Sequence, residues 1–101
     1  MKKKFRIMIL ANDFSGLLSR ILIIFNRRNL TIKNMNVCQG ATPEVLRYTI
    51  DLECIDGQID HLIKQIEKLI GVSYAFYYQE EAEEFSQPIN WENIRLPIAI
   101  L

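Results

Sequence analysis

Hydrophobic residues change their spacing several times along the chain, and each spacing predicts a particular element. Residues 5–11 read Phe-Arg-Ile-Met-Ile-Leu-Ala, so apolar side chains alternate on one face while Met8 and Leu10 make the other face apolar as well. A strand that is apolar on both faces is typical of the centre of a sheet, where other layers cover each side. We therefore expect a central strand at residues 5–11.

Three further strands are predicted from alternation and composition. Residues 31–39 alternate regularly only from Met35, since Ile32 lies three residues earlier, and this spacing indicates a bulge near the start of the strand. In residues 46–54 apolar and polar side chains alternate, which predicts one face on the core and one polar face. Residues 72–79 are rich in Tyr and Phe, as strands tend to be.

A first helix is expected from about Gly16 to about Asn29. Its predicted core stripe follows helical spacing and consists of Leu18, Ile21, Leu22 and Phe25. A monomeric surface helix needs one apolar face, so the apolar residues outside this stripe indicate a surface for a partner. These residues are Leu17, Ile23 and Ile24.

Residues 58–70 have apolar side chains at i, i+3, i+4, i+7, i+10 and i+11, which predicts a second helix capped by Gly71. The six elements then follow the order βαββαβ, which is that of the ferredoxin-like fold. We expect an α+β domain with a four-stranded antiparallel sheet and two helices on one face.

The domain is expected to span residues 1–80, and residues 81–101 are expected to be an acidic linker and an apolar C-terminal tail. Pro97 argues against a central strand in the tail. However, the stretch from Trp91 to Leu101 is too apolar to remain in water. The tail is therefore expected to dock on its own sheet or on another protein, and residue types do not choose between the two.

Charge and hydropathy exclude several classes of partner. Among the 101 residues, 12 Lys and Arg balance 12 Asp and Glu, so no basic surplus is available to displace counterions from a nucleic acid. No window reaches the roughly 18 apolar residues of a membrane span. The first residues lead into a strand pattern and not into a signal peptide. The protein is expected to be cytoplasmic and to bind neither nucleic acid nor membrane.

The two cysteines are expected to stay reduced. A hairpin centred on residues 40–43 would put Cys38 opposite about residue 46 and Cys54 opposite about residue 30. A separation of about eight strand residues far exceeds the ~7 Å between Cα atoms that a disulfide allows. We expect both cysteines to be small buried side chains.

Groups for catalysis or metal binding are sparse. His61 is the single histidine and falls on the polar face of the second predicted helix, where a solvated side chain is expected. The carboxylates are scattered, and there is no Gly-rich phosphate loop of the Walker or dinucleotide type. We expect no catalytic residue, no metal site and no cofactor.

One candidate ligand site is the first strand-to-helix turn, Asn12-Asp-Phe-Ser-Gly16. The free N–H groups and the dipole at a helix start favour an anion such as an α-carboxylate, and Gly16 would let it approach the backbone. Asp13 could accept hydrogen bonds from an ammonium group, and apolar contacts would come from Leu17, Leu18 and Ile32. On residue types alone, a purely structural turn with a helix cap is the favoured interpretation.

A resemblance to a known family favours the ligand site over the purely structural turn. Residues 12–37 have a turn ending in Gly, then Leu-Ser-Arg, an apolar helix, Phe and Arg-Asn, and they look like the opening of an ACT domain. Together with residues 62–72 and the sequence Ala75-Phe-Tyr-Tyr, they resemble the regulatory small subunit of acetolactate (acetohydroxyacid) synthase, in its short single-domain type. The match covers about residues 4–80.

The resemblance implies a homodimer of ACT domains with sheets joined side by side and a branched-chain amino acid, usually valine, bound between protomers. The chain would catalyse nothing itself and would regulate a separate thiamine-diphosphate-dependent catalytic subunit in valine, leucine and isoleucine biosynthesis. The expected effector-binding residues are Asp13, Phe14, Ser15, Gly16, Leu17, Leu18, Thr31 and Ile32.

The family usually has Asn at the positions of Asp13 and Thr31, so the identity of the amino acid stays open. The alternative is a stand-alone ACT module that binds an amino acid and regulates another enzyme.

Overall fold

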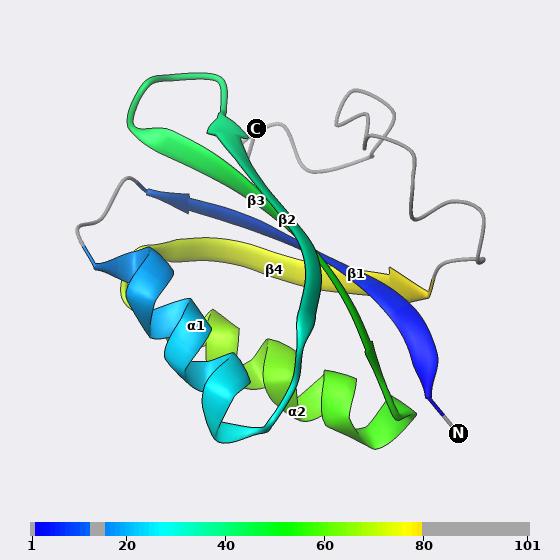
Figure 1. The fold of residues 1–101 in the computed structure, drawn as a ribbon. Helices are drawn as coiled ribbons and strands as arrows, with labels where there is room; N and C mark the ends of the chain where they lie inside the picture. The colour runs from blue at the N-terminus through cyan, green and yellow to red at the C-terminus, as the bar shows by residue number, and fades with distance from the viewer. Residues whose placement is uncertain (1, 13–15, 80–101) are drawn as a thin grey trace.

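Six elements make up the described part of the chain, which is residues 2–12 and 16–79 of the computed structural model. They are β1 (Lys3–Asn12), α1 (Leu17–Arg27), β2 (Ile32–Gln39), β3 (Val45–Cys54), α2 (Asp56–Glu67) and β4 (Val72–Gln79). Both helices lie on one side of the sheet (Figure 1). The predicted α+β fold of βαββαβ order is therefore confirmed. The expected linker and tail, residues 81–101, lie outside the described residues.

Strand β1 occupies the centre of the sheet, as its two apolar faces predict. The strand order is β2-β3-β1-β4, and all neighbouring strands are antiparallel. Ile7 of β1 lies opposite Ile50 of β3 on one side and opposite Tyr77 of β4 on the other. Residues directly opposite each other share a face of the sheet, so this row points toward the helices.

Strands β2 and β4 form the two edges of the sheet. The register of β2 against β3 shifts between Ile32 and Asn34, which confirms the predicted bulge. At the other end of this hairpin, the N–H of Gly40 donates to the carbonyl oxygen of Val45 at 2.7 Å. A Cβ at Gly40 would come within 2.8 Å of the Val45 side chain, so this close turn requires glycine.

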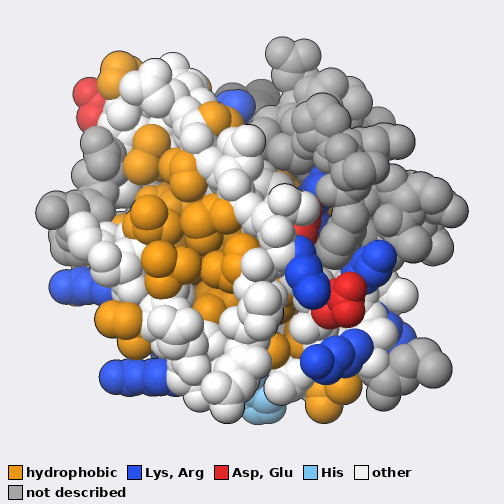
Figure 2. All heavy atoms as spheres, in the orientation of Figure 1, with side chains coloured by type: hydrophobic (Ala, Val, Ile, Leu, Met, Phe, Trp, Pro, Cys, Tyr) orange, Lys and Arg blue, Asp and Glu red, His pale blue; other side chains and the backbone are white. Residues whose placement is uncertain are grey.

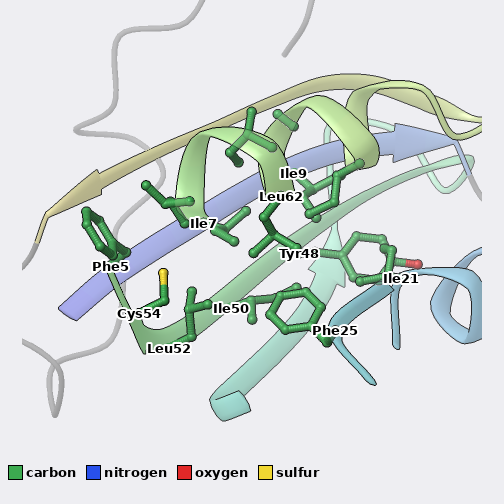
Figure 3. Packing of buried hydrophobic residues seen from close by; sticks show 14 of the residues in the cluster. Phe5, Ile7, Ile9, Ile21, Phe25, Tyr48, Ile50, Leu52, Cys54 and Leu62 are labelled. Carbon is green, nitrogen blue, oxygen red and sulfur yellow. The ribbon is translucent and has the colours of Figure 1, made fainter. Parts of the chain in front are cut away.

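The main core fills the space between the sheet and the two helices (Figure 3). Each of β1 and β3 contributes alternate residues, and each helix contributes one stripe. Its largest fully buried members are Phe25, Ile7, Ile9, Leu17, Ile21, Ile50, Leu52, Ile59, Leu62 and Ile66.

Helix α1 buries a different stripe from the one predicted. The buried residues follow i, i+4 and i+8 and are Leu17, Ile21 and Phe25, with Ile24 partly buried beside them. Leu18 and Leu22, predicted for the core, are exposed. The reason is that residues 17–24 are apolar at all positions but two, so two overlapping stripes satisfy helical spacing and the sheet selects the one that begins at Leu17.

The end of α1 has a well-defined cap. The helix ends at Arg27, two residues earlier than expected, and Asn29 adopts a left-handed conformation with φ 55°. The N–H of Leu30 then donates to the carbonyl oxygen of Phe25 at 3.0 Å. This pattern is a Schellman motif, which stops the helix and turns the chain toward β2.

Helix α2 begins two residues earlier than predicted. Its start is capped by the Gln58 side chain, whose oxygen accepts a hydrogen bond from the N–H of Ile55 at 3.2 Å. Ile70, predicted for the core, is exposed because the helix ends at Glu67 and Gly71, with φ 98°, turns the chain into β4. His61 is exposed, as predicted. No helix of the described residues is long and apolar enough to cross a membrane.

Both cysteines are free, as predicted. Cys38 lies opposite Arg47, whereas Cys54 lies beyond the pairing of Ile32 with Leu52, at the other end of β3. Cys54 is buried, but the prediction that Cys38 is buried was wrong. Cys38 is exposed because it lies on an edge strand, on the face away from the helices.

The face of the sheet away from the helices, here called the open face, holds a buried ion pair. Arg6 of β1 and Asp51 of β3 are direct cross-strand partners. Nε of Arg6 donates to Oδ1 of Asp51 at 2.6 Å, and Nη2 donates to Oδ2 at 2.9 Å. These hydrogen bonds raise the pKa of the Arg6 guanidinium further above its usual value, against the opposing effect of burial. Sequence analysis missed this pair, although Asp51 lies on the predicted polar face of its strand.

Loss of the Asp51 carboxylate should destabilise the protein strongly. Asp51→Ala would leave the Arg6 charge buried without its counter-ion, which costs about 3–5 kcal/mol. Urea denaturation at one fixed protein concentration would measure the loss in free energy of unfolding. The double variant Arg6→Met with Asp51→Leu should recover most of it, because it removes both charges together.

Lys3→Ala is the matched control. It breaks an ion pair of similar length, Lys3 Nζ to Asp56 Oδ2 at 2.9 Å, whose side chains are 39% and 65% exposed. An exposed pair of this kind contributes about 0.2–1 kcal/mol. If Asp51→Ala cost no more than Lys3→Ala, the buried pair would not have the importance assigned to it.

Candidate functional site

The described part of the candidate site begins at Gly16, at the start of α1. Gly16 is the N-cap residue, with φ 85° and ψ −1°, a left-handed conformation that favours glycine. Its carbonyl oxygen accepts the first helical hydrogen bond, from the N–H of Arg20 at 3.1 Å. No side-chain hydrogen bond caps the helix, and its first turn holds no acidic residue. The N–H groups of this turn have no partner inside the helix, as at any helix start.

Among the described residues, nothing fills the space next to the Gly16 Cα. A Cβ built on Gly16 would meet no heavy atom of the described residues within 4 Å. A ligand carboxylate could therefore approach the helix start along this direction. Asp13, Phe14 and Ser15 of the candidate site lie outside the described residues.

The two leucines that follow Gly16 have opposite environments. Leu17 is fully buried in the core, so it has only backbone groups to offer to a ligand. Leu18 is 41% exposed and is the apolar side chain that the first turn presents to solvent. Sequence analysis assigned Leu18 to the core and Leu17 to a partner surface, and both assignments were wrong because the core stripe of α1 begins at Leu17.

Thr31 and Ile32, the remaining candidate residues, lie at the opposite end of α1 from Gly16 (Figure 1). Eleven helical residues separate the two ends by about 16 Å. The sheet register agrees, because Asn12, just before the turn, pairs with Val45, whereas Ile32 pairs with Leu52. Seven residues along β3 correspond to about 24 Å. One chain therefore does not bring the two parts of the candidate site together.

An exposed apolar surface lies beside this site. Figure 2 shows hydrophobic side chains gathered over α1 and the neighbouring β2. The exposed large hydrophobic residues of these two elements are Leu18, Leu22, Ile23 and Val37, here called the α1–β2 surface. Of these, sequence analysis assigned Ile23 to a partner surface. Within the part of the chain that the structure describes, the backbone of β2 on this side has no neighbouring strand, because β2 is an edge of the sheet.

Outside the candidate site and the Arg6–Asp51 pair, the pKa values of two side chains are shifted, those of Cys54 and Tyr77. Burial raises the pKa of the Cys54 thiol, which keeps this side chain neutral and unreactive. The hydroxyl of Tyr77 donates to a carboxylate oxygen of Asp60, and this hydrogen bond raises the pKa of Tyr77. No group of three or more His, Cys, Asp or Glu among the described residues could hold a metal ion.

Comparisons with known proteins identify the family of this chain. Residues 7–74 match the family model described as the AHAS small subunit-like ACT domain. A probable acetolactate synthase small subunit of Methanothermobacter thermautotrophicus is 37% identical over 57 residues, covering 56% of this chain and 34% of that protein. The acetolactate synthase small subunit of Mycolicibacterium smegmatis is 29% identical over 87 residues, covering 86% of this chain and 51% of that protein.

A solved structure shares the fold. The crystal structure of the acetolactate synthase small subunit from Thermotoga maritima superposes with a TM-score of 0.67 at 24% identity, covering 74% of this chain and 47% of that one. The chain thus spans about half or less of the length of these relatives. Since the matching family model covers most of the described residues, the chain belongs to the family of AHAS small subunit-like ACT domains.

Proposed function

We propose that this protein is a non-catalytic regulatory subunit of acetolactate synthase, which binds a branched-chain amino acid and modulates a thiamine-diphosphate-dependent catalytic subunit. The observation that carries the proposal is the open, uncapped start of α1 at Gly16, in a chain of this family. A helix start of this kind attracts a carboxylate through its N–H groups and its dipole.

The effector site is composed of two chains. Gly16 and Thr31 lie at opposite ends of α1, whereas an amino acid is smaller than the ~16 Å length of that helix. A twofold axis near the middle of β2 would pair two β2 edges antiparallel. It would thereby bring the turn at Gly16 of one protomer to the strand start at Thr31 of its partner. In a twofold dimer each such contact occurs twice, which gives two equivalent sites.

The α1–β2 surface supports this mode of association. Leu18 and Leu22 lie four residues apart on one flank of α1 and are 41% and 37% exposed. Val37 adds apolar area from the adjacent edge strand. Burial of these side chains against a second copy would stabilise the dimer, and the unpaired edge of β2 would gain hydrogen-bond partners.

Side chains must add to the contribution of the helix start. A dissociation constant of about 1 mM corresponds to about 4 kcal/mol, while a helix terminus supplies roughly 0.3–2 kcal/mol. In the proposed site Asp13 accepts hydrogen bonds from the ammonium group of the effector, and Leu18 with the partner protomer's Ile32 contacts its aliphatic side chain. Phe14, Ser15, Leu17 and Thr31 complete the proposed site, Leu17 through its backbone.

A charge within the α1–β2 surface should weaken the dimer. Leu22→Glu would place two carboxylates in a twofold interface and remove two apolar contacts of about 1.5–3 kcal/mol each. We expect the dimer dissociation constant to rise at least about tenfold, measured by sedimentation equilibrium. Ile70→Glu, at a residue that is 67% exposed and precedes β4 at the edge of the sheet opposite to β2, should leave it unchanged. Equal self-association of Leu22→Glu and the parent chain would contradict the proposed interface.

The effector should act through Gly16. Valine, leucine or isoleucine in hundredfold excess over its dissociation constant should stabilise the parent chain by about 2.7 kcal/mol, which a thermal melt detects. Gly16→Asp should lose this response, because its carboxylate competes with that of the effector at the helix start.

Gly57→Asp is the control, since a Cβ at Gly57 also meets no heavy atom of the described residues within 4 Å. Gly57 lies at the start of α2, after Cys54, which pairs with Lys3 at the end of β1 opposite to Asn12. Gly57→Asp should add a carboxylate to a helix start and keep the response. A Gly16→Asp variant that still responds would place the effector elsewhere.

A catalytic partner should respond to this chain. Addition of the protein to an acetolactate synthase large subunit from the same genome should raise the rate of acetolactate formation, and the two should co-purify. The alternative is a stand-alone ACT module that binds an amino acid and regulates another enzyme. An effector response without co-purification and without a change in rate would favour that alternative.

A further inference from the structure

The outer edge of β2 carries none of the residues that usually protect an edge strand. Residues 34–39, here called the regular part of β2, read Asn-Met-Asn-Val-Cys-Gln and include no charge and no proline. Natural proteins place such residues on edge strands to prevent pairing with another chain. In a twofold pairing of one strand with its own copy, charges would meet like charges and repel. This uncharged edge therefore fits a second copy of the same chain.

One hydrogen bond of the β2–β3 hairpin shows which backbone groups of β2 face the free edge. The N–H of Gly40 donates to the carbonyl oxygen of Val45, so the backbone groups of Gly40 point toward β3. Backbone groups alternate in direction along a strand, and the regular part keeps one register against β3. The groups of the even-numbered residues thus point toward β3, whereas the outward groups are those of Met35, Val37 and Gln39.

The side chains of β2 alternate with the same period. Met35 lies opposite the core residue Ile50, so the odd-numbered side chains lie on the side of the sheet that holds both helices (Figure 1). Asn36 lies opposite Thr49, on the open face. Residues directly opposite each other share a face. If two copies place their α1–β2 surfaces on the same side, odd-numbered residues must lie opposite odd-numbered ones. The twofold axis then passes through a residue and not between two residues.

The hydrophobic pattern chooses among the three residues at the middle of the regular part. An axis at Met35 would place Val37 opposite Lys33, which lies within the bulge. An axis at Val37 would place Met35 opposite the polar Gln39. An axis at Asn36 places Met35 opposite the partner's Val37, and the twofold repeats this apolar contact. Register is set by such matching of apolar positions, so the axis at Asn36 is favoured.

We propose that β2 pairs with β2 of a second copy in one register, with Asn36 on the twofold axis. The proposal rests on the dimer of the proposed function and assigns its strand contacts. Met35 lies opposite the partner's Val37, and Asn34 lies opposite the partner's Cys38. Asn36 lies opposite the partner's Asn36, where two carboxamides can hydrogen-bond because each has a donor and an acceptor.

This register brings the two parts of the proposed effector site to one level of the joined sheet. Asn12, where β1 leads into the turn, lies opposite Val45, which accepts the hydrogen bond from Gly40. Across the proposed axis the same row reaches the partner's Ile32, within about one residue because of the bulge. A neighbouring axis position would shift the partner strand by two residues, or about 7 Å.

Disulfide cross-linking distinguishes this register from its neighbours. In a Cys38→Ser background, Asn36→Cys places two thiols opposite each other in a pair without mutual backbone hydrogen bonds, where Cα atoms are about 4.5 Å apart. A disulfide allows about 4.4–6.8 Å. Mild oxidation with copper phenanthroline should therefore give a covalent dimer on a non-reducing gel. Asn34→Cys in the same background is the matched control and should stay unlinked, because its two copies would be about 13 Å apart.

A second pair tests the same register away from the axis. With the native Cys38 retained, Asn34→Cys should link to the partner's Cys38, which lies opposite it. The parent chain should not link through Cys38 alone, since the two copies of Cys38 would also be about 13 Å apart. Cys54 is buried and is present in all of these variants, so it does not affect the comparison.

Sedimentation equilibrium of the reduced proteins separates the register from the dimer itself. A dimer in which Asn36→Cys does not link, or in which Cys38 alone links, would overturn the register and leave the proposed function intact. A chain that stays monomeric at all concentrations would overturn both. The expected cross-links, in a chain whose melting temperature no amino acid changes, would support the register and contradict the proposed effector.

Discussion

The pairing of β1 with both β3 and β4 is the interaction on which the rest of the structure depends. It places one strand between two others, and both faces of this strand are buried, with Ile7 toward the helices and Met8 away from them. It also fixes the position of the turn at Gly16, since β1 ends immediately before it. The N–H of Asn12 donates to the carbonyl oxygen of Gly71 at 2.7 Å, so the end of β1 is also tied to the turn that precedes β4.

The fold could be predicted from the sequence because its signals are local and agree with one another. Alternation gave the strands, the irregular spacing of Ile32 gave the bulge, and helical periodicity gave α2. The buried stripe of α1 could not be predicted, because Leu17 and Leu18 both begin an apolar ladder of the correct spacing. Only the packing of α1 against the sheet distinguishes the two ladders. The exposure of Cys38 depends in the same way on the edge position of β2.

The candidate site was predictable only in part. Gly16 follows from residue type, since a left-handed helix cap and an open approach both favour glycine. The separation of Gly16 from Thr31 does not follow from residue type, because the two are close in sequence and lie at opposite ends of one helix. The Arg6–Asp51 pair was missed because each residue alone is an ordinary polar side chain of an alternating strand. Its importance arises from the register, which a single strand does not encode.

Strand β1 extends from the buried Arg6–Asp51 ion pair to the turn that holds the proposed site. Arg6 lies near one end of β1 and the turn at Gly16 follows the other end. An effector bound at Gly16, as proposed, would therefore lie close to an element whose central position holds it rigidly. A ligand shifts an equilibrium only if it binds two states with different affinity. Because β1 has strong contacts on both faces, the two states are expected to differ mainly in the dimer contact and not within the sheet. The α1–β2 surface, which is exposed and apolar, is therefore where an effector bound between protomers would change the free energy of association.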